Sequence, residues 1–173
     1  MKIAGKDIGV WAQKATPFEI LSLAIRMEQG AAAGYRRLAR SARTPPAQAK
    51  FRYLAEEERE HARLLAAARA RLVRPTVGMA LPLTAAEVSG APEGESPVAA
   101  VRLALQAEKE ANAFYLACAR RCGKGAAGEM FRLLAAQERG HAAELSRELK
   151  QLAGPLPWSS LEGTVPEEKD YWS

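Results

Sequence analysis

The chain has 173 residues, of which 48% are hydrophobic, and a formal net charge of +5 at pH 7. This length and composition suit one well-buried core, so we expect a single domain. No stretch approaches the roughly 18 uninterrupted apolar residues of a membrane span, and the first residues lack the apolar run of a signal peptide. We therefore expect a soluble, cytoplasmic protein with no membrane partner.

The basic excess, with a sequence pI near 9.4, could indicate nucleic-acid binding. The basic residues are instead spread along the expected outer faces of helices, with acidic residues among them, and the chain shows no recognition helix or aromatic stacking pattern. We therefore expect a solvated surface and no specific nucleic-acid partner. The two cysteines are too few for a disulfide framework or a four-thiolate metal site.

Residues 1–16 form a short polar lead whose isolated apolar residues, Trp11 among them, can pack on the body of the protein. Thr16 and Pro17 then indicate a helix start, because threonine can cap free backbone amides and proline in the first turn loses no hydrogen bond. Apolar residues at three-and-four spacing predict a helix from there to about Arg43.

The Thr-Pro-Pro segment at 44–46 predicts a tight break, and the next apolar stripe predicts a second helix over 47–73, with Leu72 on its inward face. Residues 74–97 are rich in proline and glycine without sustained periodicity, so they form a connection. A connection of this length is unusual within a compact domain. In a four-helix bundle, a crossover that travels the length of the bundle explains it.

The second half repeats this pattern, with helices predicted over 96–121 and 126–152 and a glycine-rich turn between them. The fold prediction is an all-α four-helix bundle over 17–153, followed by a Pro-rich tail over 154–173. The tail contains Trp158 and Trp172, which can pack on the protein's own surface or anchor a subunit contact. A homodimer is therefore a candidate assembly.

Two related motifs show that the chain is internally duplicated. The stretch FRYLAEEEREHA at 51–62 recurs as FRLLAAQERGHA at 131–142, and each copy contains Glu-x-x-His. Each copy is preceded by a lone glutamate, which a tyrosine follows seven residues later. Corresponding residues are offset by 80 positions (138 − 58, for example), and the pairs are Glu28 and Glu108, Tyr35 and Tyr115, Glu58 and Glu138, and His61 and His141.

The spacing of these residues predicts a site for two metal ions. Residues three apart project from the same side of a helix, so each Glu-x-x-His pair can approach one ion. Buried carboxylates are costly unless they are paired or metal-bound, and no lysine or arginine occupies the inward stripes. Two divalent cations would balance this charge. The predicted metal ligands are Glu28, Glu58, His61, Glu108, Glu138 and His141.

Hard oxygen donors with a few imidazoles favour two iron ions, and manganese or zinc could substitute for them. The alternative is a metal-free bundle that descends from a metal-binding one. Tyr35 and Tyr115 are the candidate catalytic residues; alternatively, each is a core aromatic whose hydroxyl reaches a ligand carboxylate. Asn112 and Glu57 are candidates for orienting the ligands, and a solvated position is the alternative for Glu57.

The phrases EKEANAFY and ERGHA resemble the rubrerythrin and ferritin-like superfamily, and the likeness runs through both halves, from about Phe18 to Leu152. The resemblance implies that Glu28 and Glu108 are terminal ligands of two irons. It also implies that Glu58 and Glu138 bridge the irons and that His61 and His141 each hold one of them.

The chain departs from the rubrerythrin pattern in two respects. It lacks a rubredoxin-like site of four cysteines, so its electrons are expected from an external donor. Ala111 stands where rubrerythrins have a further glutamate, and His141 where they usually have glutamate. The ligand set is nearer to that of bacterioferritin, which shifts the expectation from efficient peroxidase chemistry toward oxidation of ferrous iron.

The expected function is that of a cytoplasmic non-haem di-iron protein. Such a protein oxidises ferrous iron, or reduces hydrogen peroxide or oxygen, at a carboxylate-bridged site. One alternative is an iron storage or binding protein without sustained turnover, which would require a cage. Another is a metal-free bundle that serves as a structural or interaction module.

Overall fold

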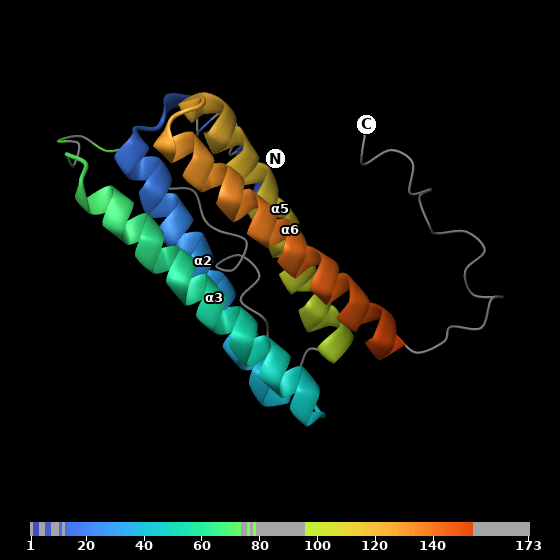
Figure 1. Cartoon of the computed structure of the whole chain (residues 1–173). Helices are drawn as coiled ribbons and strands as arrows, with labels where there is room; N and C mark the ends of the chain where they lie inside the picture. Colours follow the sequence, from blue (N-terminus) through green and yellow to red (C-terminus); the bar gives the residue numbers. More distant parts are fainter. Residues whose placement is uncertain are drawn as a thin grey trace, which may run out of the picture.

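The computed structural model describes the backbone of residues 2–3 and 6–7, residue 11, and residues 13–73, 76, 78 and 96–153. Four long helices form one bundle within this part of the chain (Figure 1): α2 (Pro17–Ser41), α3 (Pro45–Ala70), α5 (Pro97–Cys122) and α6 (Ala126–Ala153). Strand β1 (Lys2–Ile3) pairs antiparallel with β2 (Lys6–Asp7), a small feature that sequence reasoning missed. The predicted four-helix architecture is confirmed.

Three of the helices begin with serine or threonine followed by proline. The hydroxyl of Thr16 accepts a hydrogen bond from the backbone N–H of Glu19 (3.3 Å), whose carboxylate accepts one from the N–H of Thr16 (2.7 Å). The hydroxyl of Ser96 accepts a hydrogen bond from the backbone N–H of Ala99 at the start of α5. The predicted tight break between the first two helices is present, but it lies at 42–44, because Thr44 caps α3 and Pro45 already lies in the helix. The first helical turn needs no backbone donor, so prolines fit there.

The helix ends also depend on proline and glycine. Helix α3 ends three residues earlier than predicted, before Pro75, which cannot continue a helix and disfavours helical backbone in the residue before it. Leu72 therefore leaves the inward stripe and is 38% exposed. Helix α5 ends at Gly123, whose φ of 68° suits glycine. In the first turn of α6, a Cβ on Gly128 would overlap the carbonyl oxygen of Gly123.

The four helices form two antiparallel pairs, α2 beside α3 and α5 beside α6 (Figure 1). Helix α3 ends at one end of the bundle and α5 begins at the other, so the chain crosses the length of the bundle between them. The predicted crossover is confirmed by these two helix ends. The path of most of the predicted connection, 74–97, lies outside the described residues.

Two apolar clusters fill the bundle. They correspond to each other through the internal duplication, because positions in one cluster match positions in the other at an offset of 80 residues. Tyr35 stacks on Phe51 with ring centroids 6.4 Å apart, and Tyr115 stacks on Phe131 at 6.0 Å. The first cluster includes Tyr35, Phe51, Leu54, Val101 and Leu145, and the second includes Tyr115, Phe131, Leu134, Leu21 and Leu65. On every helix, one cluster precedes the predicted metal ligands and the other follows them. The duplication therefore places those ligands in the middle of the bundle.

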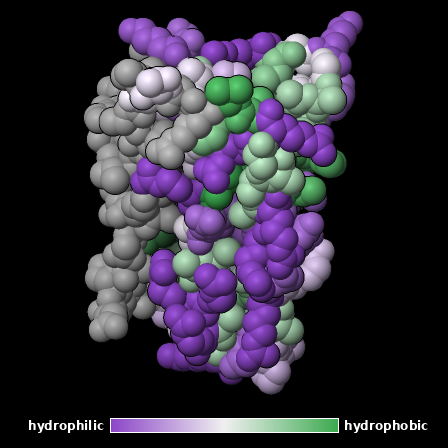
Figure 2. Space-filling model, turned by 90° about the vertical axis from the view of Figure 1, so that its left-hand side faces the viewer, coloured by the Kyte–Doolittle hydropathy of each residue, from purple (hydrophilic) through white to green (hydrophobic). Residues whose placement is uncertain are grey.

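The outer helix faces carry charged residues of both signs, as predicted. Arg59 pairs with Glu56 (2.6 Å) and Arg63 with Glu60 (2.5 Å), all on exposed positions of α3. Hydrophilic residues cover most of the described surface seen in Figure 2, with hydrophobic residues interspersed among them. None of the helices that the structure describes combines the length and apolar character of a bilayer-spanning helix.

Of the N-terminal lead, Trp11 is half-buried and packs against the cluster that contains Tyr115. The tail predicted over 154–173, with Trp158 and Trp172, lies outside the described residues. The division of the chain into lead, bundle and tail stays a prediction.

Candidate metal centre

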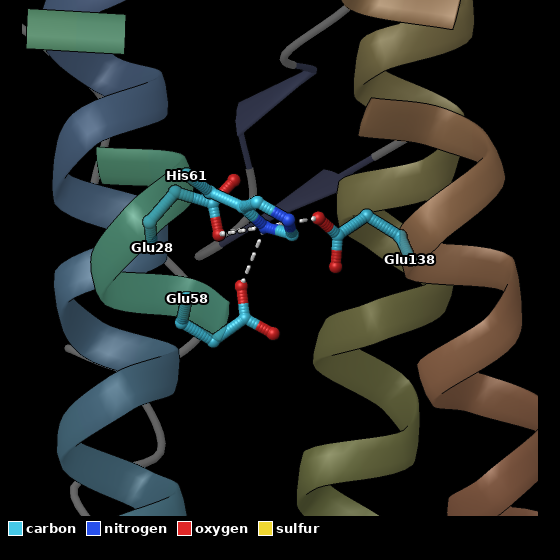
Figure 3. A group of neighbouring side chains, drawn as sticks. All are labelled: Glu28, Glu58, His61 and Glu138. Atoms are coloured by element: carbon cyan, nitrogen blue, oxygen red, sulfur yellow. Dashed lines mark hydrogen bonds and ion pairs between the residues drawn. The ribbon is translucent and has the colours of Figure 1, made fainter. Parts of the chain in front are cut away.

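The six predicted ligands meet in the middle of the bundle. Helices α2 and α5 each contribute one glutamate, and α3 and α6 each contribute a Glu-x-x-His pair. None of the six residues is more than 5% exposed. Figure 3 shows four of them pointing toward one another from α2, α3 and α6: Glu28, Glu58, His61 and Glu138.

The ligand atoms form two groups of four residues, and within each group they lie within 4.8 Å of one another. The first group is Glu28, Glu58, His61 and Glu138, and the second is Glu58, Glu108, Glu138 and His141. Both groups therefore share Glu58 and Glu138. The rings of His61 and His141 face each other across the site, with centroids 5.8 Å apart and planes inclined by 17°.

The two shared glutamates turn one oxygen toward each histidine. Glu58 places Oε2 at 3.1 Å from Nδ1 of His61 and Oε1 at 2.8 Å from Nδ1 of His141. Glu138 places Oε1 at 3.3 Å from Nδ1 of His61 and Oε2 at 3.5 Å from Nδ1 of His141. A carboxylate in this position can bind two ions at once, so the geometry suits a bridging role.

The two unshared glutamates are each held by a tyrosine of the other half of the chain. The hydroxyl of Tyr115 donates to Oε1 of Glu28, and that of Tyr35 donates to Oε1 of Glu108 at 2.5 Å. The second oxygen of each glutamate remains on the histidine side, at 3.9 Å from His61 and 3.7 Å from His141. Both tyrosines thus orient a carboxylate, and a catalytic role for them stays a prediction.

Burial and mutual contact shift the pKa values of all six groups. Burial raises the pKa of Glu28 and Glu108 well above the usual range. Burial also acts on the shared glutamates, but the nearby imidazoles outweigh it, so the pKa of Glu58 is lowered and that of Glu138 falls to about 2. For the histidines, burial is outweighed by the surrounding carboxylates, which raise the pKa of His61 to about 12 and raise that of His141.

These pKa directions describe a charge balance without metal. Two ionised shared glutamates face two protonated histidines, while the other two glutamates are neutral acids. Four ionised carboxylates and two neutral imidazoles would balance two divalent cations equally well. The site can therefore exchange protons for metal ions without leaving a large uncompensated charge in the core.

Buried polar atoms at the centre that lie close to one another but form no well-aligned hydrogen bond test whether metal ions fit. Oε1 of Glu58, Oε1 of Glu138 and Nδ1 of His141 are buried without an aligned hydrogen-bond partner. An unsatisfied buried polar atom typically costs about 1–3 kcal/mol. In the described part of the chain, no lysine or arginine pairs with the four ligand carboxylates. A buried set of four carboxylates and two imidazoles, whose oxygen and nitrogen atoms are not all satisfied by hydrogen bonds, fits two divalent cations.

Three further residues lie near the centre. Glu57 places Oε2 at 3.3 Å from Nε2 of His141, so it contacts a predicted ligand from outside the two groups. The amide of Asn112 donates to the carbonyl of Ala135 (2.5 Å), which ties α5 to α6 and does not orient a ligand. Sequence reasoning missed Tyr53, which lies one turn before Glu57 on α3 and whose pKa is raised by that neighbouring carboxylate. Their separation of four residues on one helix is the signal that could have found it.

A four-helix bundle with a glutamate from each of two helices and Glu-x-x-His from each of the other two is the pattern of ferritin-like dimetal carboxylate proteins. The four helices and the buried acidic and histidine groups of this chain match that pattern, and the two groups could hold metal ions.

Comparison with known proteins identifies the family. The rubrerythrin family model matches residues 19–77 and 100–168, more than half of the chain, so the protein belongs to the rubrerythrin family. Among solved structures, it is similar to a hypothetical protein from Pyrococcus furiosus, with 28% sequence identity and a TM-score of 0.64. That similarity covers 80% of this chain and 90% of the other. No curated protein matches the chain.

Proposed function

We propose that the protein binds two iron ions and uses them to oxidise ferrous iron with hydrogen peroxide or oxygen. The observation that carries this proposal is the pair of buried four-residue groups that share Glu58 and Glu138. Oxygen donors outnumber imidazoles two to one in this set, which favours iron, with manganese or zinc as substitutes. When bound, two ferrous ions supply the two electrons that, with two protons, reduce one hydrogen peroxide to two waters.

The residues of the chain hold and prepare this site. Glu58 and Glu138 offer one oxygen to each position, while Glu28 and Glu108 each serve one position. Tyr35 and Tyr115 keep the unshared carboxylates turned inward. The apolar clusters on both sides of the site exclude bulk water. One chain supplies all six side chains, so the site is complete without a second copy.

Sustained turnover requires electrons from outside the chain. The sequence contains two cysteines, which cannot form a four-thiolate electron-transfer site. The electron source is therefore an external donor protein or ferrous iron itself. In the second case iron is the substrate, and each turnover consumes further ferrous ions.

The first experiment measures metal content. Metal-free protein is loaded with ferrous iron without oxygen, freed of excess metal, and assayed for iron per chain. We expect two irons in the wild type and a loss of at least one in Glu58→Gln and Glu138→Gln. Glu60→Gln is the matched control, because Glu60 lies on the same helix as Glu58 but is exposed and pairs with Arg63. Loss of iron in this control as well would show that binding is not at the buried site.

The second experiment measures the reaction. Hydrogen peroxide or oxygen is added to the loaded protein, and the oxidant consumed and the ferrous iron remaining are both followed. We expect one hydrogen peroxide to be consumed for every two ferrous ions oxidised. Wild-type protein that binds no iron, or that binds it but reacts with neither oxidant faster than iron in buffer, would refute the proposed function. Accumulation of iron far beyond two per chain in a large particle would favour storage instead.

A further inference from the structure

The internal duplication is broken next to the metal centre. Directly before Glu58, α3 carries Glu57, whereas directly before Glu138, α6 carries Gln137 at the corresponding position (137 − 57 = 80). The six ligands and both supporting tyrosines are the same residue types in the two halves. The change from carboxylate to amide is therefore a difference between two otherwise matched positions.

The difference between Glu57 and Gln137 changes the surroundings of one histidine only. The carboxylate of Glu57 lies 3.3 Å from Nε2 of His141, the ring nitrogen that faces away from the ligand group. Among the described residues, the carboxylates near His61 all approach its Nδ1, and Gln137 forms no hydrogen bond with its outer nitrogen. Gln137 has the same side-chain length as glutamate and, like Glu57, is half-buried, but it carries no negative charge.

A carboxylate on the outer nitrogen of a ligand histidine has known physical consequences. It can only accept a hydrogen bond, so it keeps the proton on Nε2 and leaves the lone pair of Nδ1 free for a metal ion. Its negative charge makes the imidazole a stronger electron donor, and removing such a partner typically lowers metal affinity about 10–100-fold. His61 lacks this partner within the described residues.

We propose that Glu57 makes the two metal positions unequal, so that the group containing His141 binds its ion first and more tightly than the group containing His61. Glu57 is then a positioning residue, which acts through His141 and does not itself hold the metal. The inference rests on the proposed function to the extent that both positions bind divalent cations. It adds an order of filling and names the residue that sets it.

The test titrates metal-free protein with Co²⁺ in the absence of oxygen and follows the visible absorption of the bound ion against a competing chelator. We expect two binding steps in the wild type. Glu57→Gln should weaken the tighter step about 10–100-fold and leave the weaker step unchanged. The reverse change, Gln137→Glu, should strengthen the weaker step, because it supplies a carboxylate of the same length beside His61. A purely structural role for Glu57 would not produce that gain.

Two histidine variants assign the steps to the positions. His141→Ala should remove the tighter step and His61→Ala the weaker one. Equal weakening of both steps by Glu57→Gln, or loss of the tighter step in His61→Ala, would overturn the inference. Two steps that Glu57→Gln leaves unchanged would overturn it while the proposed function stands. Wild-type protein that binds no Co²⁺ and no iron would overturn both.

Discussion

Binding of divalent metal should release protons from the centre. In the metal-free protein, carboxylates raise the pKa of His61 to about 12 and also raise that of His141, so both carry a proton at pH 7. Each must lose it, because only a neutral imidazole can bind a metal. Burial holds the pKa of Glu28 and Glu108 well above the usual range, so these groups release up to two more protons. We expect between two and four protons per chain when both ions bind.

The sign of the pH dependence follows from this release. Protons and metal ions compete for the same groups, so metal binding weakens as the pH falls. Each proton released changes the free energy of binding by about 1.4 kcal/mol per pH unit. Two to four protons therefore correspond to about 3–6 kcal/mol per pH unit, summed over both ions.

Calorimetry measures the proton count directly. Metal-free protein is titrated with Mn²⁺ or Co²⁺ at pH 7 in two buffers that differ in ionisation enthalpy, and the difference in heat gives the protons released. Glu60→Gln, the exposed control on α3, should give the wild-type count. Release of less than one proton per chain on binding of two ions would refute this account, because it would mean that both histidines are already neutral.

Three further predictions concern stability. Tyr115→Phe should lower the free energy of unfolding of metal-free protein by about 1–3 kcal/mol, because it leaves buried Glu28 without its donor; urea denaturation measures this, and an unchanged midpoint would contradict it. Gly123→Ala should lower the free energy of unfolding by about 1–3 kcal/mol, because the backbone conformation of Gly123 suits glycine almost exclusively. Gly125→Ala should lower it much less, because Gly125 has open space for a Cβ and no positive φ. Divalent metal at 100 times its Kd should stabilise the fold by about 2.7 kcal/mol, and a melting temperature that does not respond to metal would show that no ion binds the folded state preferentially.

The sequence alone predicted most of the fold and all six residues of the two groups. Helical periodicity and the three-residue spacing of Glu58 and His61 are local properties, so they can be read without knowing how the helices pack. The offset of 80 residues then identified the corresponding residues in the second half, Glu138 and His141. Sequence reasoning began the second helix at 47, two residues too late, because a proline that separates two helices and one that begins the second differ only in which residues around it are helical.

Packing between helices decided the contacts that make the site specific. Tyr35 contacts Glu108 and Tyr115 contacts Glu28, across separations of 73 and 87 residues, and neither periodicity nor the repeat says which tyrosine serves which glutamate. Glu57 could equally have faced solvent, and its approach to His141 over 84 residues follows from the placement of α3 beside α6. The sequence by itself determined which groups enter the core, because burial follows the stripe of each helix. Only the tertiary structure decided which oxygen faces which histidine, because those distances depend on the relative positions of four helices.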